Sequence, residues 1–100
     1  MAACLVFHNR IHNAAKMQEY VPKALETLAP YHPGILIFDE HSQVIEGNAP
    51  WPRTIVIKFD SREVAMAWYN SPAYQAVLPL RLAATEGFAV LVDEYVPPGP

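Results

Sequence analysis

Several things are scarce in this sequence, and each scarcity excludes a class of protein. Cys4 is the only cysteine among 100 residues, so no disulfide can form within the chain, as is usual in a reducing compartment. The seven lysines and arginines are scattered and the net charge is −3, which disfavours a nucleic-acid partner. The apolar run near the N-terminus is too short for a signal peptide or a membrane span. We therefore expect a cytoplasmic protein that binds neither nucleic acid nor a membrane.

Charge is scarce as well, and apolar residues are in surplus. Only 17% of the residues are charged and 52% are apolar. The length suits one domain, which we place at residues 1–96 with an extended tail at 97–100. A chain of this size buries only about 60–70% of the surface that it exposes when unfolded. The surplus apolar side chains need another surface to cover them, and a subunit interface is the simplest.

Apolar runs predict four strands along the chain. We expect them at residues 2–11, 35–38, 54–59 and 88–95, and a brief strand or edge ribbon at 44–46. Two regions with apolar residues at helical spacing lie between these strands, one at about 13–28 and one at about 60–86.

Local signals set the expected ends of the helices. Pro22 should kink the first helix, and Asp60 with Glu63 predicts a capping box at the start of the second. Ser71, followed by a proline, should cap a new helix and so divide the second region in two, and Gly87 should end it. The buried stripe expected after this break is Ala73, Ala76, Val77, Leu80, Ala83 and Ala84.

The resulting β-α-β-β-α-β order is that of the ferredoxin-like α+β fold, a four-stranded antiparallel sheet with helices on one side. An antiparallel sheet with one wet face should alternate polar and apolar residues, but residues 35–38 and 88–92 are apolar on both faces. Helices cover one face, and this chain has nothing left for the other. We therefore predict a homodimer in which two sheets pack face to face.

Few patterns point to a specific chemistry. The chain has no dinucleotide-binding, P-loop, nucleophile-elbow or zinc-protease motif. His8 and His12 have a spacing that binds metal on a helix, but on a strand they lie about 13 Å apart, so we expect no metal. His8 admits two interpretations: a strand end that emerges into solvent, or a polar patch at the mouth of a cavity.

Trp51 and Arg53 stand on either side of a proline, just before the third strand. Trp51 could pack as a lid or plug an interface. Arg53 could bind a carboxylate, from Glu46 of the same chain or from a ligand.

Aromatic residues gather around the predicted helix break. Trp68 lies on the stripe that should face the sheet, so its expected place is the core. A helix broken at Ser71 and packed on a sheet should leave a gap, and Tyr69 and Tyr74 are suited to lining it because each has a polar tip.

The stretch EGNAPWPRTIVIKFDSREVAMAWYNSPAYQAVLPLR, residues 46–81, resembles the signature of the DUF1330 family. The shared features are an E-G pair, W-P with an arginine, a strand ending in F-x-S, the run A-W-Y-x-S-P-x-Y-Q and a later L-R. The chain departs from the family at His32–Gly34 and at Asp39–Glu40, where glycines are common, and at Ala73, where an acidic residue is usual. The resemblance implies membership of the dimeric α/β-barrel superfamily.

This superfamily includes cofactor-independent monooxygenases, polyketide cyclases, muconolactone isomerases, haem-dependent chlorite dismutases and dimeric stress proteins, so the resemblance leaves open whether the chain is an enzyme. It implies a homodimer with a pocket between sheet and helices for a small apolar or aromatic metabolite. An enzyme would work without a cofactor, with His8 as general base and Arg53 or Arg81 holding an oxyanion or a carboxylate. The expected walls are Trp51, Trp68, Tyr69 and Tyr74. The alternatives are a non-catalytic ligand carrier or stress-related module and, last, a haem-dependent enzyme.

Overall fold

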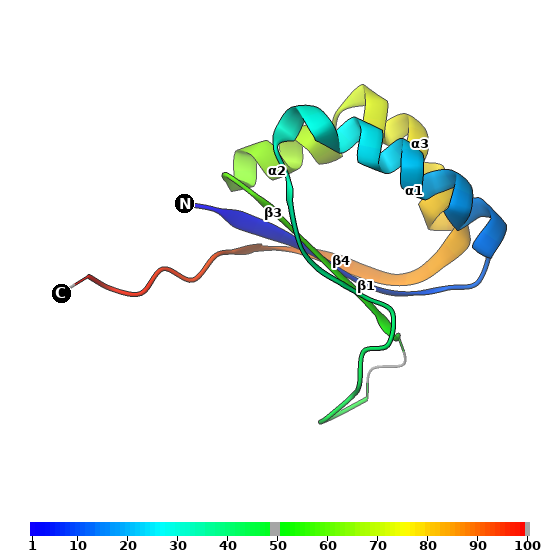
Figure 1. Ribbon diagram of the computed structural model, residues 1–100, viewed down its shortest axis with the longest axis horizontal. Helices are drawn as coiled ribbons and strands as arrows, with labels where there is room; N and C mark the ends of the chain where they lie inside the picture. Colours follow the sequence, from blue (N-terminus) through cyan, green and yellow to red (C-terminus); the bar gives the residue numbers. More distant parts are fainter. Residues whose placement is uncertain (49–50, 100) are drawn as a thin grey trace.

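The computed structural model of the protein describes residues 1–48 and 51–99. The elements, in chain order, are β1 (Ala3–Ile11), α1 (Ala14–Leu28), the short 3₁₀ helix η1 (Ala29–Tyr31), β2 (Gly34–Asp39), β3 (Arg53–Phe59), α2 (Arg62–Tyr69), α3 (Pro72–Ala84) and β4 (Thr85–Asp93). The strands form one antiparallel sheet in the order β2-β3-β1-β4, and the helices lie on one side of it (Figure 1). The predicted ferredoxin-like α+β fold is confirmed.

Alternation along β1 and β3 gives the sheet two different faces. Leu5 is paired with Ile57 and Phe7 with Ile55, and all four side chains are buried against the helices. We call this the inner face. The intervening residues, such as Val6, point to the opposite side, which we call the outer face, because successive side chains of a strand point in opposite directions.

The first helix follows its apolar stripe. The Asn13 side chain caps α1 by accepting a hydrogen bond from the backbone nitrogen of Lys16 at 3.1 Å. Pro22 lies inside α1, and the helix runs on to Leu28. The buried residues of α1 are Met17, Tyr20, Ala24 and Leu28.

The second helical region is divided as predicted, but its first cap differs. The Ser61 side chain, not that of Asp60, caps α2 by accepting from the backbone nitrogen of Val64 at 3.1 Å. Ser61 is the residue with extended backbone immediately before the helix, which is where an N-cap must lie. Ser71 caps α3 and Pro72 is its first residue, which confirms the predicted break.

The buried side of α3 agrees with the predicted stripe only in part, since Val77 and Ala84 are buried and Leu80 packs partly buried against the core. Its buried residues are Tyr74, Val77, Leu78, Arg81 and Ala84, while Ala73, Ala76 and Ala83 are exposed. Larger side chains remove more apolar area from water than alanine does, so the face that carries them turns inward. Arg81 and Tyr74, both with polar tips, are thereby brought into the interior.

Two predictions about strands are wrong. Gly87 does not end a helix, because β4 begins before it at Thr85. Gly87 has φ +146°, and a Cβ atom there would lie 2.2 Å from the backbone oxygen of His8, so only glycine allows β4 to approach β1 this closely. Residues 44–46 form no strand, and Ile45 extends into solvent with 91% of its surface exposed. Residues 97–99 of the expected tail have no regular structure, and Pro100 lies outside the described residues.

Candidate ligand pocket

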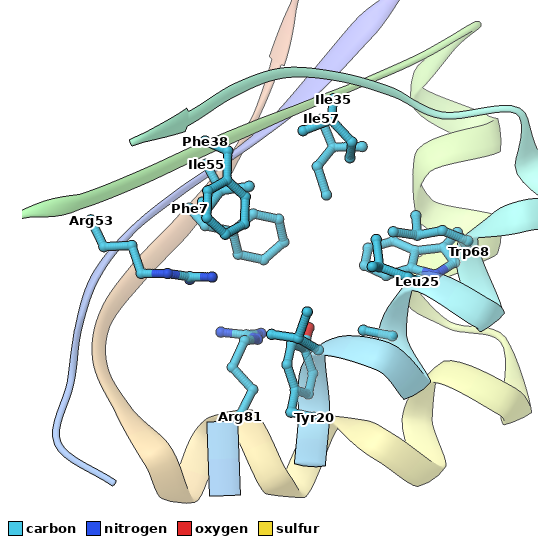
Figure 2. Close-up of a pocket in the computed structure, with 13 residues that line it drawn as sticks. Phe7, Tyr20, Leu25, Ile35, Phe38, Arg53, Ile55, Ile57, Trp68 and Arg81 are labelled. Atoms are coloured by element: carbon cyan, nitrogen blue, oxygen red, sulfur yellow. The ribbon is translucent and has the colours of Figure 1, made fainter. Parts of the chain in front are cut away.

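A cavity of about 190 Å³ lies between the inner face of the sheet and the helices. Figure 2 shows it from within, with the sheet on one side and α1, α2 and α3 on the others. The sheet contributes Phe7, Ile35, Phe38, Arg53, Ile55 and Ile57, and the helices contribute Tyr20, Val21, Ala24, Leu25, Leu28, Trp68 and Arg81. The walls are therefore almost entirely apolar, with three polar tips among them.

The cavity reaches the surface between α1 and β2. Strand β2 is an edge strand, so no strand lies beyond it. The side chains at this rim are apolar and about half exposed, with exposed fractions of 53% for Leu25, 46% for Ile35 and 56% for Phe38. A small apolar molecule entering here would cover side chains that are otherwise in contact with water.

Two arginines point into the cavity from opposite walls. Arg53 comes from the start of β3 and Arg81 from α3, and their guanidinium groups face the same space (Figure 2). They are only 7% and 8% exposed. The Cζ of Arg81 lies 5.1 Å from the ring centroid of Phe7, and the Cζ of Arg53 lies 5.3 Å from that of Phe38. Both contacts are cation–π contacts, which partly compensate a buried positive charge.

No carboxylate among residues 1–48 and 51–99 forms an ion pair with either arginine. The hypothesis that Glu46 pairs with Arg53 is therefore wrong. Glu46 lies in an exposed segment, whereas the Arg53 side chain turns inward, where its Nη1 donates to Asn9 Oδ1 at 3.4 Å. Arg53 Nε and Asn9 Nδ2 are buried and have no hydrogen-bond partner.

Arg81 belongs to a short hydrogen-bonded chain of side chains. Its Nε donates to the hydroxyl of Tyr74 at 3.3 Å, and that hydroxyl lies 2.7 Å from the hydroxyl of Tyr20. Tyr20 is on the cavity wall, while Tyr74 is fully buried behind it. The chain therefore connects the guanidinium group of α3 to a hydroxyl of α1.

The ionisation of these groups reflects their burial. Burial raises the pKa of Tyr20 well above its usual range, and the adjacent Tyr74 raises it further. Burial also lowers the pKa of Arg53, and the positive charge of Arg81 adds to this lowering while Glu40 opposes it. For Arg81, burial acts to lower the pKa, but the neighbouring Tyr74 and Tyr20 outweigh it and the pKa is raised. At neutral pH the cavity thus presents two guanidinium cations and a neutral phenol.

The structure brings some of the predicted site residues together and separates others. Arg53, Arg81 and Trp68 line the cavity. Tyr74 supports it from behind, with its ring centroid 4.0 Å from that of Trp68. Tyr69 packs against the other side of this pair, at 6.3 Å from the Trp68 centroid, and does not line the cavity.

His8 and Trp51 lie on the outer face, away from the cavity. His8 Nδ1 is 3.2 Å from the Thr54 hydroxyl, which is in turn 2.7 Å from that of Ser42. The His8 ring lies 6.0 Å from that of Trp51 and 5.6 Å from that of Phe88. The sheet therefore separates His8 from both arginines.

Sequence reasoning missed two residues, Tyr20 on the cavity wall and Asn9 beside Arg53. Tyr20 lies in the region at about 13–28 where apolar residues at helical spacing predict a helix, and nothing in that pattern gives its hydroxyl a role. Asn9 lies on the inner face between Phe7 and Ile11, where a polar residue on an otherwise apolar face was the available signal. It is 2% exposed.

The described residues contain neither a cluster suited to a metal ion nor a helix suited to a membrane. Residues 1–48 and 51–99 contain no group of three or more histidine, cysteine, aspartate or glutamate side chains placed to hold a metal ion. Over the same residues, every helix is too short or too polar to cross a membrane.

Solved structures with the same fold come from several bacteria. RPA0582, a protein of unknown function from Rhodopseudomonas palustris, is 12% identical with a TM-score of 0.81, covering 96% of this chain and 84% of that one. SnoaB, a cofactor-independent oxygenase from Streptomyces nogalater, is 10% identical with a TM-score of 0.65, covering 96% and 95%. A dimeric ferredoxin-like protein of unknown function from Thermobifida fusca is 12% identical with a TM-score of 0.63, covering 94% and 92%. At these identities the likeness concerns the fold alone.

A comparison with functionally curated proteins finds no match. The sequence model of one family does match, and it covers nearly the whole chain, from residue 2 to residue 95. This range includes every strand and helix and all the residues that line the cavity. The chain therefore belongs to the DUF1330 family, a domain of unknown function.

Proposed function

We propose that the protein is a homodimer that binds a small apolar or aromatic molecule in the cavity of each subunit. The observation that carries the proposal is the apolar cavity between the sheet and α1, in a chain of only 100 residues. An apolar cavity of about 150 Å³ is large enough to accept benzene. At about 190 Å³, this cavity has room for one ring and a small substituent.

The outer face supports the dimer. Its partly exposed apolar side chains include Ile37 of β2 at 46%, and Phe88 and Val90 of β4 at 49% and 43%. Contiguous exposed apolar surface of this kind is typical of protein interfaces. The Thermobifida fusca structure is of a dimeric protein with the same fold, and in a face-to-face dimer His8 and Trp51 would lie near the interface. Light scattering should then give about twice the subunit mass of 11.2 kDa.

Binding is favoured over catalysis inside the cavity. The titratable groups on its walls are Tyr20, Arg53 and Arg81, and each keeps its proton at neutral pH. Among the described residues, the walls therefore offer no general base for proton abstraction. His8, the base proposed from the sequence, would act only on a molecule held between subunits at the outer face.

Cofactor-independent catalysis is the second candidate, and the Tyr20–Tyr74–Arg81 chain favours it. A guanidinium group and a phenol that are already in place stabilise a developing oxyanion at little reorganisation cost. Isomerisation through an enolate needs no redox partner, but the proton that leaves carbon must pass to water or to a basic group of the bound molecule, because the described walls carry no base. SnoaB, which has the same fold, is a cofactor-independent oxygenase.

The cavity proposal can be tested with toluene as a neutral apolar probe. We expect toluene to shift the NMR signals of Trp68 and Tyr20, which line the cavity. Ala24→Leu, which fills space on the cavity wall, should weaken binding at least tenfold, whereas Ala15→Leu on the exposed side of α1 should not. If toluene leaves the Trp68 and Tyr20 signals unchanged in the wild-type protein, the cavity is not a binding site.

A further inference from the structure

We propose that the ligand of this cavity is an organic monocarboxylate with an apolar body the size of one ring, whose carboxylate lies between Arg53 and Arg81. This inference rests on the proposed function, because it names the chemistry of the molecule that the cavity binds. Three observations carry it: two buried cations that form no ion pair among the described residues, two buried donors without an acceptor, and the shape and apolarity of the remaining walls.

The first observation is uncompensated charge. A buried guanidinium group normally has a carboxylate close by, because desolvation of an unpaired charge costs several kcal/mol. Arg53 and Arg81 face one space and neither forms an ion pair among the described residues, although the charge of Glu40 acts on Arg53. They are also close enough for the charge of Arg81 to lower the pKa of Arg53. An anion between them would turn this repulsion into two attractions.

The second observation is the kind of hydrogen-bonding group that lacks a partner. The large majority of buried polar groups in folded proteins are hydrogen-bonded, so each exception needs a reason. Among the described residues the two exceptions are Arg53 Nε and Asn9 Nδ2, which are both donors on adjacent side chains, and Arg53 lines the cavity. The missing group must therefore supply acceptors. An ionised carboxylate is acceptor-only and can accept two parallel bonds from one arginine.

Tyr20 adds a third donor on the opposite wall. The hydroxyl of Tyr74 accepts a hydrogen bond from Arg81, and it can itself donate a hydrogen bond to the oxygen of Tyr20. In that arrangement the Tyr20 hydroxyl points its hydrogen into the cavity, where it would donate a hydrogen bond to an acceptor atom of the ligand. Two guanidinium groups and a phenol would then surround one carboxylate.

The rest of the cavity fits an apolar body and not a second charge. Away from the arginines the walls are Phe7, Ile55, Ile57, Trp68 and the apolar residues of α1. A small inorganic anion would leave these walls unfilled, and a dicarboxylate would place its second charge against them without a donor. The volume of about 190 Å³ accommodates a ring such as that of benzoate.

The test compares benzoate with benzamide, which has the same shape and no charge. We expect calorimetric titration of the wild-type protein to show that benzoate binds at least tenfold more tightly than benzamide. Arg53→Met and Arg81→Met should each remove this preference. Arg10→Met, the matched control, removes an exposed arginine that pairs with Glu86 and should leave the preference unchanged.

Stability without ligand supplies a second readout. If the role of Arg53 is to bind an anion and not to stabilise the fold, Arg53→Met should raise the urea midpoint of the ligand-free protein. The reason is that methionine fills the same space without a buried charge. Benzoate should raise the midpoint of the wild-type protein and not that of the variant. A purely structural arginine would give the opposite result, a lower midpoint for the variant. If Arg53→Met does not fold, Arg53→Gln removes the charge while keeping a polar side chain.

The outcomes separate this inference from the proposed function. Equal binding of benzoate and benzamide at the cavity would overturn the carboxylate and leave the cavity as an apolar site. Tight binding of benzoate that neither arginine variant weakens would also overturn it. Displacement of benzoate by equimolar phosphate would contradict the apolar body. If toluene, benzamide and benzoate all fail to bind, both the proposed function and this inference are wrong.

Discussion

The two faces of the sheet differ more than any other two regions of this molecule. On the inner face, Phe7 and Asn9 are almost fully buried, one on the cavity wall and one beside Arg53. On the outer face, the neighbouring residues Val6 and His8 are only partly buried. Helices close one face, and within the described chain no element covers the other. This difference between the two faces supports the proposed dimer.

The comparison also explains why the predicted site is divided. His8 is paired with Thr54 and Asn9 with Arg53, so these two pairs are adjacent in the ladder. Adjacent pairs project to opposite faces of a sheet, and one residue of difference is enough to change the face. Residues that are close in register can therefore take part in different functions, one at an interface and one in a cavity.

The largest expected effect comes from the inner face. Trp68 is 1% exposed, stacks on Phe59 and donates from Nε1 to the Thr27 hydroxyl at 3.0 Å. Trp68→Ala should lower the free energy of unfolding by about 3–5 kcal/mol, because it leaves a large cavity in the core. Urea denaturation measures this. Phe88→Ala on the outer face is the comparison and should cost less in the monomeric protein. If it lowered the free energy of unfolding of the monomer as much as Trp68→Ala does, the two faces would be equally packed.

The outer face should respond to a charge by losing its partner. Val90 is 43% exposed in the single subunit and pairs with Val6 in the ladder. Val90→Lys should weaken the proposed dimer at least 100-fold, about 2.8 kcal/mol, because a charge would be buried between two apolar faces. Light scattering should then give a mass near 11.2 kDa. Leu82→Lys, on the exposed side of α3, is the control, and a dimer that survives Val90→Lys would place the interface elsewhere.

The junction of β1 and β4 tests how closely the strands must approach. Gly87→Ala should cost about 1–3 kcal/mol, because the new Cβ would meet the His8 backbone oxygen and alanine disfavours a φ of +146°. Thermal denaturation followed by circular dichroism measures the loss. Gly99→Ala, where a Cβ would meet nothing within 4 Å, should leave the melting temperature unchanged. An unchanged melting temperature for Gly87→Ala would mean that β4 lies farther from β1.

The smallest effect is expected from one hydroxyl at the cavity. Tyr20→Phe should cost about 0.5–1.5 kcal/mol at neutral pH, since it removes the hydrogen bond to Tyr74. It should also change the response to alkali. Burial raises the pKa of Tyr20 in the folded state. Its contribution to the free energy of unfolding is therefore fully present below about pH 10, the ordinary tyrosine pKa. Above that pH the contribution declines, because Tyr20 ionises in the unfolded chain and not in the folded one.

Urea denaturation between pH 8 and 11 would separate this contribution from those of other groups. The wild-type protein should lose stability more steeply above pH 10 than Tyr20→Phe does. Tyr95→Phe, at an exposed position, should follow the wild-type curve. Identical curves for wild type and Tyr20→Phe would show that Tyr20 is not buried as described.

Much of the fold could be predicted, and the errors have local causes. The four strands, the helix order and the break at Ser71 follow from apolar spacing and from cap chemistry. The predicted stripe on α3 was wrong at Ala73, Ala76 and Ala83, because several faces of that helix are apolar and periodicity alone does not choose among them. The prediction that Gly87 ends the helix was wrong because a glycine that ends a helix and a glycine at a close strand contact look alike in sequence.

By itself, the sequence determined the element order and the family, and it marked Arg53, Arg81 and Trp68 as candidates for one site. Only the tertiary structure decided that His8 lies on the other face, that Tyr20 joins the arginines, and that no described carboxylate neutralises them. The physical reason is distance along the chain. Alternation and caps are local and can be read within a few residues, whereas the cavity is formed by side chains from α1, β3 and α3, which only packing brings together.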